Sequence, residues 1–234
     1  MRVVLIGRGR LATNLLPALQ QAGHEVVSIN SRTLEGLPTE ADVFVVAVKD
    51  SALKDVISQA TKGREQQLFV HTAGSMPMSL FEGYTSRYGV FYPMQTFSKE
   101  RIVDFAEVPV FVEGECPQVR QLAESMSHRV YALSSEHRKY LHLAAVFACN
   151  FANHCYALSA ELLEKHGLPF DVMLPLIDET ARKVHELHPL DAQTGPAVRY
   201  DENVIRMQSA LLSDTPALQE IYDLLSLSIH RKAQ

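Results

Sequence analysis

The sequence of 234 residues has few cysteines, no block of basic residues and no long apolar run. Cys116, Cys149 and Cys155 are odd in number and lack CxxC spacing, which argues against disulfides and favours a reducing compartment. The acidic and basic residues are interleaved and give a formal charge of −5, so nothing favours a nucleic-acid or membrane partner. No segment has the length of a transmembrane helix, and the apolar run after Met1 is too short for a signal peptide. We therefore expect a soluble cytoplasmic protein that acts on a small molecule.

The pattern of apolar residues changes at about residue 133. Before it, β-branched runs alternate with helical patterns, and unbroken runs such as Val43–Val48 are typical of parallel strands covered on both faces. After it, a Ser134 cap opens a helical pattern of about thirty residues that ends near Gly167. We expect an α/β domain with a doubly wound, mainly parallel sheet over 1–133, and an all-helical domain over 134–234. The expected strands are 3–6, 25–29, 42–48, 67–71, 89–92, 108–112 and 129–132, and the later helices are 170–187, 201–212 and 214–231.

A glycine-containing turn follows the first expected strand. The stretch Gly7-Arg8-Gly9-Arg10-Leu11-Ala12 leads directly into a helical pattern and then a second strand, which is the start of a dinucleotide-binding βαβ unit. Gly7 would make the tight turn, Gly9 would let the backbone approach a pyrophosphate, and Ala12 would pack the helix on the strand. Free N–H groups at the helix start would hold the phosphates. The alternative is a structural bend without a ligand.

The residues after the second strand indicate which dinucleotide would bind. NAD-binding proteins usually carry an acidic residue there for the ribose 2′-OH, but this chain has Asn30, Ser31 and Arg32. Ser31 can donate to a 2′-phosphate, and Arg32 can bind it with two N–H groups or stack on the adenine. We expect NADP(H) in preference to NAD(H). The alternative is that Arg32 is only a solvated loop charge.

Several stretches together resemble a known family. The GxGxxA turn, Asn30–Arg32, and segments 41–53, 69–77 and 92–98 resemble the Rossmann domain of NADP oxidoreductases, which is similar to coenzyme F420-dependent NADP reductases and pyrroline-5-carboxylate reductases. Segments 142–168, 174–184 and 194–201 resemble the uncharacterised DUF2520-type domain usually paired with it, which is similar to the C-terminal domain of 6-phosphogluconate dehydrogenase. This resemblance covers essentially the whole chain and implies no substrate.

The resemblance also implies which residues contact NADP(H). Ala47, Val48 and Lys49 would pass under the cofactor, and the residues after His71 would border the nicotinamide. One departure concerns the Lys-x-x-x-Asn pair that related hydroxyacid dehydrogenases carry on their first long helix, because Val146 takes the place of the lysine before Asn150. A mechanism that uses this lysine as proton donor is therefore in doubt. The expected cofactor-binding residues are Gly7, Arg8, Gly9, Arg10, Leu11, Ala12, Asn30, Ser31, Arg32, Ala47, Val48, Lys49, Thr72, Ala73 and Gly74.

Four polar residues are candidates for catalysis. His142, Asn150 and Asn153 fall on one face of the long helix at α-helical spacing, amid apolar neighbours. His71 ends a strand at the edge of the sheet where ligands bind, and could donate a proton or contact the nicotinamide. We expect the substrate to lie between this strand end and the polar stripe. The alternatives are backbone capping, ordinary loop packing, or contact with a twin helix in a dimer.

Other polar positions give weaker signals. Gln95 and Thr96 could shape a substrate pocket, and Arg199 could pair with a carboxylate or phosphate, but each also fits an ordinary loop or helix-entry turn. His185 and His188 are three residues apart, which does not match the HExxH zinc motif. We expect no metal.

Two classes of function fit these features. The favoured one is an NADP(H)-dependent oxidoreductase that moves a hydride to or from a small carbonyl or imine held between the domains. The other is a non-catalytic NADP-binding sensor or scaffold, which the missing lysine favours. A deazaflavin partner such as coenzyme F420 remains open. A homodimer is expected in both cases, because the long helix carries more apolar residues than one small domain can cover, including Phe147, Phe151, Tyr156, Leu158 and Leu162.

Overall fold

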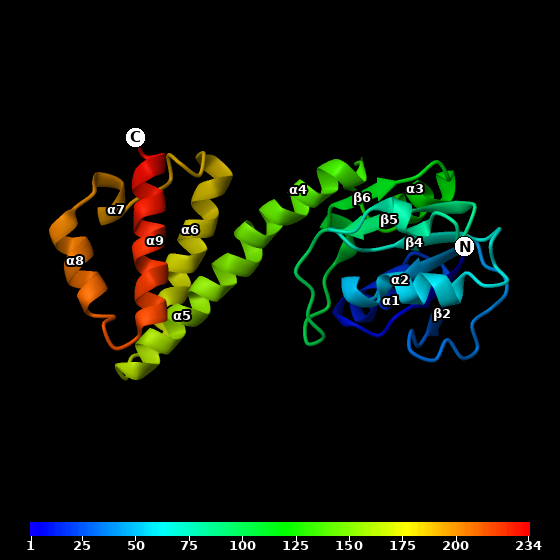
Figure 1. The fold of residues 1–234 in the computed structure, drawn as a ribbon, viewed down its shortest axis with the longest axis horizontal. Coiled ribbons are helices and arrows are strands. Elements are labelled where there is room, and N and C mark those ends of the chain that lie inside the picture. Colours follow the sequence, from blue (N-terminus) through cyan, green and yellow to red (C-terminus); the bar gives the residue numbers. More distant parts are fainter. The chain divides into compact units, whose positions relative to one another are not determined.

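A computed structural model describes all residues from Met1 to Gln234 and divides the chain into two compact units (Figure 1). The first unit is Met1–Phe151 and the second is Ala152–Gln234. We expected the division after residue 133, but the units divide inside the long helix. The reason is that the first turns of this helix are bonded to the sheet, as described below.

The first unit is built on a seven-stranded sheet with the order β2-β1-β3-β4-β5-β6-β7. Strands β1 to β5 are parallel, β6 runs antiparallel to β5, and β7 runs parallel to β6. The expected doubly wound, mainly parallel sheet is thus confirmed. The strands are β1 (Arg2–Ile6), β2 (Glu25–Ile29), β3 (Val43–Val46), β4 (Leu68–His71), β5 (Arg87–Pro93), β6 (Val110–Glu113) and β7 (Val130–Ala132).

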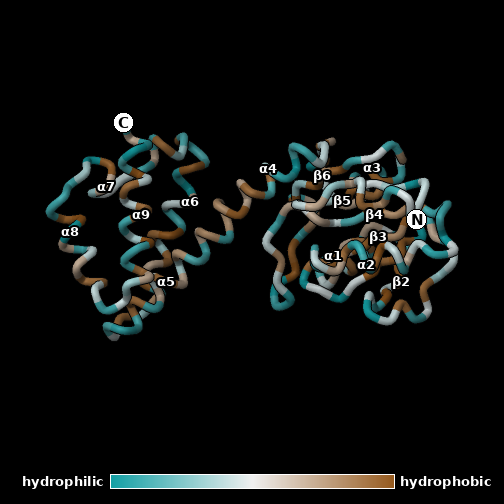
Figure 2. Tube along the Cα trace, in the orientation of Figure 1, coloured by the Kyte–Doolittle hydropathy of each residue, from teal (hydrophilic) through white to brown (hydrophobic).

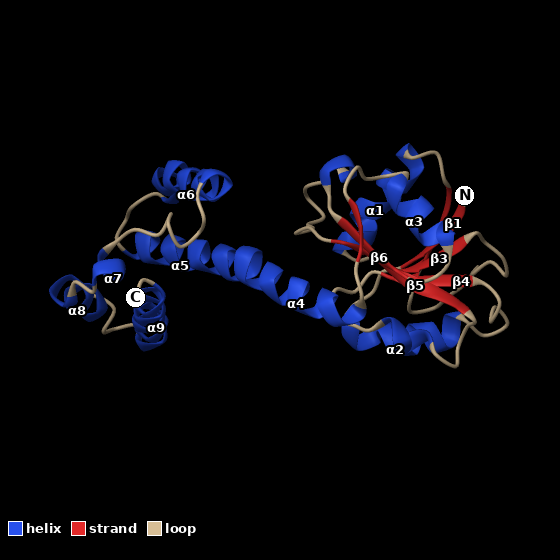
Figure 3. Cartoon of the chain, turned by 90° about the horizontal axis from the view of Figure 1, so that it is seen from above, coloured by secondary structure: helices blue, strands red, loops and turns tan.

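Helices cover both faces of this sheet (Figure 3). Helices α1 (Arg10–Gln21) and α3 (Pro117–Glu124) pack on one face, and α2 (Asp50–Ala60) packs on the other. In β1, Val3 and Leu5 belong to the first hydrophobic core, whereas Val4 and Ile6 belong to the second. Because both faces are buried, the central strands are unbroken apolar runs, which appear brown in Figure 2.

The long helix forms as expected, with one local change. Ser134 caps its start by accepting a hydrogen bond from the backbone N–H of His137. Helix α4 (Ser135–Ala145), a π-helical segment (Val146–Phe151) and α5 (Ala152–Lys165) then follow one another directly. Gly167, with φ of 69°, lies just beyond the end. The sequence did not predict the π-helical segment, which is a rare conformation often found at functional sites.

The second unit is entirely helical, as expected. Besides α5 it contains α6 (Leu174–Glu186), α7 (Pro196–Arg199), α8 (Glu202–Ala210) and α9 (Pro216–Lys232), with a 3₁₀ turn at Phe170–Met173. An ion pair joins Lys165 to Asp214, and the Tyr222 hydroxyl donates to Gln208 Oε1 at 2.7 Å. None of the helices in the chain combines the length and the apolar character that a membrane span requires.

The second unit buries very little of itself. Only Ala197, Leu212 and Ser226 are buried among its residues. Many large apolar side chains are exposed instead, and Leu176, Leu211 and Leu224 are each more than 60% exposed. Monomeric proteins seldom expose so much apolar surface. The other exposed apolar side chains of this unit are Leu162, Leu168, Val172, Leu174, Val184, Leu187, Leu190, Tyr200, Met207, Leu225 and Leu227.

The homodimer stays a prediction, and these exposed side chains support it. Replacing Leu224, which is 68% exposed on α9, with lysine should weaken self-association because a charge would be buried in an apolar interface. Light scattering at micromolar concentration should report a dimer for the wild-type chain and more monomer for Leu224→Lys. Lys54→Glu, which changes an exposed charge on α2, should leave the dimer intact. A monomeric wild-type chain would refute the prediction.

Candidate functional site

The carboxyl-terminal ends of β1, β3, β4 and β5 lie at one edge of the sheet, because these strands are parallel. Backbone hydrogen bonds join the residues that leave these strands: Ala47 N–H donates to Ile6, and Thr72 N–H donates to Val46. In open α/β sheets this edge is the usual place for ligands. All of the expected cofactor-binding residues of the first unit lie at or beside this edge.

The turn between β1 and α1 is shaped for a close approach to a ligand. Gly7 has φ of 137°, and a Cβ at this position would lie 2.1 Å from the backbone oxygen of Ala47. Only glycine fits there. A Cβ on Gly9 would meet nothing within 4 Å, so the space beside it is open. Ala12 is buried in the core beneath α1.

The start of α1 is left without a side-chain cap. Gly9 is the N-cap residue and has no side chain to accept a bond, and the first turn contains no acidic residue. The first N–H groups of the helix are therefore free to bind an anion, which the helix dipole also favours. The uncapped helix and the open space beside Gly9 fit a dinucleotide diphosphate.

Exposed basic groups lie at the loops of this edge. Arg8 and Arg10 flank Gly9, and Arg32 follows β2; all three are exposed, and none forms an ion pair. The backbone N–H of Arg32 donates to Asn30 Oδ1 at 3.0 Å, so Asn30 shapes the loop that carries the guanidinium. Ser31 and Leu11 are half-buried at the same turns.

The segments after β3 and β4 are more buried. Ala47 is buried, Val48 is half-buried, and exposed Lys49 is the N-cap residue of α2. Thr72, Ala73 and Gly74 are all buried. At the end of this segment the hydroxyl of Ser75 donates to the carboxylate of Asp50 at the start of α2.

His71 is fully buried, and backbone groups occupy both of its ring nitrogens. Nδ1 accepts from the Ala73 N–H at 3.2 Å, which leaves Nε2–H to donate to the Pro77 carbonyl at 3.3 Å. Burial, with a smaller contribution from the charge of Arg138, lowers the pKa of His71 to about 4. These contacts hold His71 neutral and fix the loop after β4, which argues against its expected role as a proton donor. Sequence alone gives no sign of such backbone partners.

His142 has different surroundings. This half-buried side chain of α4 places Nδ1 3.1 Å from the Tyr92 hydroxyl, and the two rings meet edge to face at 6.0 Å. No protein group is hydrogen-bonded to its Nε2. A Cβ on Gly74 would lie 2.6 Å from His142 Nδ1 and 2.8 Å from Tyr92 Cζ, so the pair packs directly on the backbone of Gly74. The structure thus brings His142 to the loop after β4.

An ionic network that the sequence did not reveal holds α4 on the sheet. Arg138 is 0% exposed; it donates to Glu113 Oε2 at 2.5 Å, to the Met76 carbonyl at 2.6 Å and to Ser135 Oγ at 3.1 Å. The backbone N–H and hydroxyl of Ser135 donate to the Glu113 carboxylate at 2.8 and 2.6 Å. Partial burial would raise the pKa of Glu113, but the hydrogen bonds from Ser135 and Arg138 outweigh it and lower that pKa.

Asn150 and Asn153 are exposed, and their side chains form no hydrogen bond within the chain. Asn150 lies in the π-helical segment of the first unit, whereas Asn153 lies in α5 of the second. Their expected alignment with His142 assumed regular α-helical spacing. A π-helical turn has i→i+5 bonds and contains more residues, so that spacing argument no longer applies. Their catalytic role stays a prediction.

The side chains of the remaining weak candidates form no hydrogen bond outside their own loop. Gln95 and Thr96 are exposed after β5, and Gln95 Oε1 accepts from the Thr96 N–H at 2.8 Å. Arg199 is exposed at the end of α7, a short helix that begins after Gly195.

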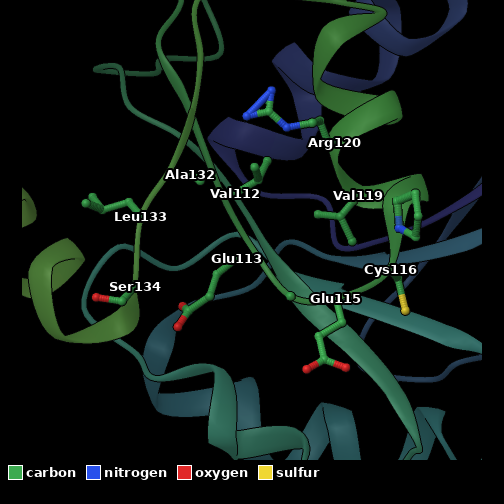
Figure 4. A pocket seen from close by; sticks show the side chains of 11 residues that line it. Val112, Glu113, Glu115, Cys116, Val119, Arg120, Ala132, Leu133 and Ser134 are labelled. Carbon is green, nitrogen blue, oxygen red and sulfur yellow. The ribbon is translucent and has the colours of Figure 1, made fainter.

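An open depression of about 480 Å³ lies where the end of β6, the start of α3 and the end of β7 meet (Figure 4). In the strand order of the sheet, β3, β4 and β5 separate β6 from β1, which leads to Gly7 and Gly9. Glu115, Cys116 and Arg120 line the depression, and none of the expected site residues does.

The fold is Rossmann-like, with a helical region after it, and comparisons with known proteins agree. The family model "Domain of unknown function (DUF2520)" matches residues 108–229, and the chain belongs to this family. The structure of "putative NADP oxidoreductase BF3122 from Bacteroides fragilis" is 51% identical, with a TM-score of 0.92 over 98% of both chains. A comparison with curated proteins found none similar to this chain.

More distant solved structures share the fold. An imine reductase from Streptomyces aurantiacus has 14% identity and a TM-score of 0.65, covering 100% of this chain and 98% of its own. A 1-pyrroline-5-carboxylate reductase from Streptococcus pyogenes has 13% identity and a TM-score of 0.63, covering 99% and 98%. The resemblance inferred from the sequence is confirmed.

The depressed pKa of His71 predicts a loss of stability in acid. Because the unfolded chain binds a proton at His71 near pH 6.5 and the folded chain only near pH 4, stability falls as the pH drops through this window and then levels off. Protonation of His71 in the unfolded chain lowers the free energy of unfolding by about 3 kcal/mol across this window. His71→Asn keeps an acceptor near the Nδ1 position and should make unfolding of the first unit less pH-dependent. Urea unfolding at pH 7, 5.5 and 4 measures this, and equal pH dependence in both proteins would contradict it.

Proposed function

We propose that the chain is an NADP(H)-dependent oxidoreductase. The observation that carries this proposal is the β1–α1 turn, with its closely packed Gly7, open Gly9 and uncapped helix start. The 51% identical relative described as an NADP oxidoreductase supports it. A bound nicotinamide would supply or accept the hydride, and the protein would orient it and exclude water. The N–H groups of the first turn of α1 would hold the diphosphate.

The preference for NADP(H) is part of the proposal. None of the first five residues after β2, positions 30–34, is a carboxylate that would repel a 2′-phosphate or bind a free 2′-OH. The exposed, unpaired guanidinium of Arg32 could donate two hydrogen bonds to the phosphate, and the hydroxyl of Ser31 could add a third. Arg8 and Arg10 add positive charge at the same edge.

The proposed substrate is a small carbonyl or imine. Hydride addition to C=O or C=N develops negative charge on the oxygen or nitrogen atom, which then needs a hydrogen bond or a proton. Asparagine can donate the hydrogen bond, and histidine can donate either. His142 is the donor nearest to the loop after β4, and exposed Asn150 is the second candidate. Participation of Asn153, and a substrate site shared with the helical unit, stay predictions.

A non-catalytic NADP-binding sensor or scaffold is the second candidate. The observation that favours it is Val146, which occupies the place of the lysine that donates the proton in related hydroxyacid dehydrogenases. A measurement of turnover distinguishes the oxidoreductase from the non-catalytic sensor or scaffold. A panel of carbonyls and imines with NADPH, followed at the nicotinamide absorbance, should show consumption of NADPH for an enzyme, and binding without consumption for a sensor.

NADPH should bind at least about tenfold more tightly than NADH, which is ~1.4 kcal/mol, the scale of one charge-assisted contact. Arg32→Ala should abolish most of this preference by weakening NADPH binding alone. Calorimetry with both cofactors measures the effect. Arg87→Ala, which removes an exposed guanidinium at the start of β5, should leave both affinities unchanged. Equal affinities in the wild-type chain would refute the assignment of NADP(H).

Asn150→Ala should lower kcat on the order of a hundredfold, because it removes a donor to the developing charge. Affinity for NADPH should change little, since Asn150 is not among the residues expected to bind the cofactor. Asn150→Asp has the same shape but lacks the N–H donor, so it should show the same loss. Steady-state kinetics and calorimetry provide the two readouts. Unchanged turnover in both variants would assign Asn150 no role in catalysis.

A further inference from the structure

The two histidines near the loop after β4 have opposite hydrogen-bonding environments. His71 lies between an amide N–H, which can only donate, and a carbonyl, which can only accept. This arrangement fits a single neutral form, because a proton on Nδ1 would point at the Ala73 N–H. His142 instead faces a phenolic hydroxyl, which can both donate and accept.

Tyr92 can therefore be a partner for His142 in both of its charge states. When the imidazole is neutral, the hydroxyl donates to Nδ1 and the ring proton resides on Nε2. When the imidazole is charged, Nδ1–H donates to the phenolic oxygen and Nε2 still carries a proton. In either state the ring keeps its orientation, and Nε2–H faces away from Tyr92, where no protein group is bonded to it.

The surroundings of Tyr92 keep its hydroxyl protonated. The side chain is 8% exposed, and its ring lies 6.3 Å from that of Phe111. Burial raises the pKa of Tyr92 to about 12, although the positive charge of Arg138 opposes this. The other charged or titratable groups near it are Cys149 and Asp50. The phenol thus serves as a hydrogen-bonding partner and does not ionise near neutral pH.

We propose that Tyr92 is a positioning residue that holds His142 with Nε2–H directed outward, and that His142 is the proton donor of the reaction. This proposal rests on the proposed function. During reduction, hydride from the reduced cofactor adds to the carbon of the C=O or C=N bond, and the π electron pair moves to the oxygen or nitrogen. That atom takes the proton from Nε2 of the charged imidazole. The N–H electron pair stays on Nε2, which leaves a neutral ring whose one proton is on Nδ1, donating to Tyr92. A proton from water then returns to Nε2 and restores the charged imidazole for the next turnover.

Gly74 makes this arrangement sterically possible. A Cβ there would lie 2.6 Å from His142 Nδ1 and 2.8 Å from Tyr92 Cζ, closer than van der Waals contact allows. An alanine at this position would therefore push apart the two groups that must stay in hydrogen-bonding distance. The resemblance assigned Gly74 to the cofactor site. Its contact with His142 and Tyr92 is a second reason why this position must be glycine.

The first test follows the ring nitrogens of His142 by ¹⁵N NMR in the full chain. In the wild-type protein at high pH, Nδ1 should be an unprotonated acceptor and Nε2 protonated, in a single tautomer. Tyr92→Phe and Gly74→Ala should both give a mixture of tautomers. Tyr88→Phe, which removes a hydroxyl from the same strand, should leave the wild-type spectrum. His71 should stay neutral down to about pH 4 and is the internal reference for folding.

The second test is kinetic. Tyr92→Phe should lower kcat about tenfold and change the pH profile, with KM and NADPH affinity nearly unchanged, because only proton transfer is affected. A wild-type tautomer in Tyr92→Phe would overturn the positioning role. Altered tautomers with unchanged turnover would overturn proton donation by His142. If the wild-type chain binds NADPH but reduces no carbonyl or imine, the proposed function fails together with the proton transfer, while the NMR result still decides the role of Tyr92.

Discussion

The buried guanidinium of Arg138 is the interaction on which the candidate site depends. It joins the first turns of α4 to β6 through Glu113 and to the loop after β4 through the Met76 carbonyl. An unpaired charge at this depth would be strongly destabilising, so the loop and the helix are held in one arrangement. His142 lies one helical turn further along the same face, and this anchor is what places it against Gly74.

Other close contacts at the same edge of the sheet fix the backbone of the loops that form the rest of the site. Gly7 presses against Ala47, and His71 holds the loop after β4 through two backbone bonds. The open space beside Gly9 and the unpaired guanidinium of Arg32 are the groups left free for a ligand. A rigid edge with a few unsatisfied donors is what a dinucleotide site requires, because preorganised donors bind without first being rearranged.

The sequence predicted the structural features that depend on local residue patterns. Unbroken apolar runs predicted the buried strands, and Ser134 and Gly167 indicated where the long helix begins and ends. The π-helical segment carries no comparable signal in Val146–Phe151, so the face of Asn150 could not be derived from spacing. The role of His71 and the burial of Arg138 depend on carbonyls and carboxylates far away in the chain, which no local pattern reveals.

The central claim is that the edge around Gly7, Gly9 and Arg32 binds NADP(H). A crystal structure of the chain soaked with NADPH tests it most directly. The account predicts the diphosphate on the N–H groups of the first turn of α1 and the 2′-phosphate within hydrogen-bonding distance of the Arg32 guanidinium. A dinucleotide bound elsewhere, or no dinucleotide at a concentration that saturates binding in solution, would contradict it.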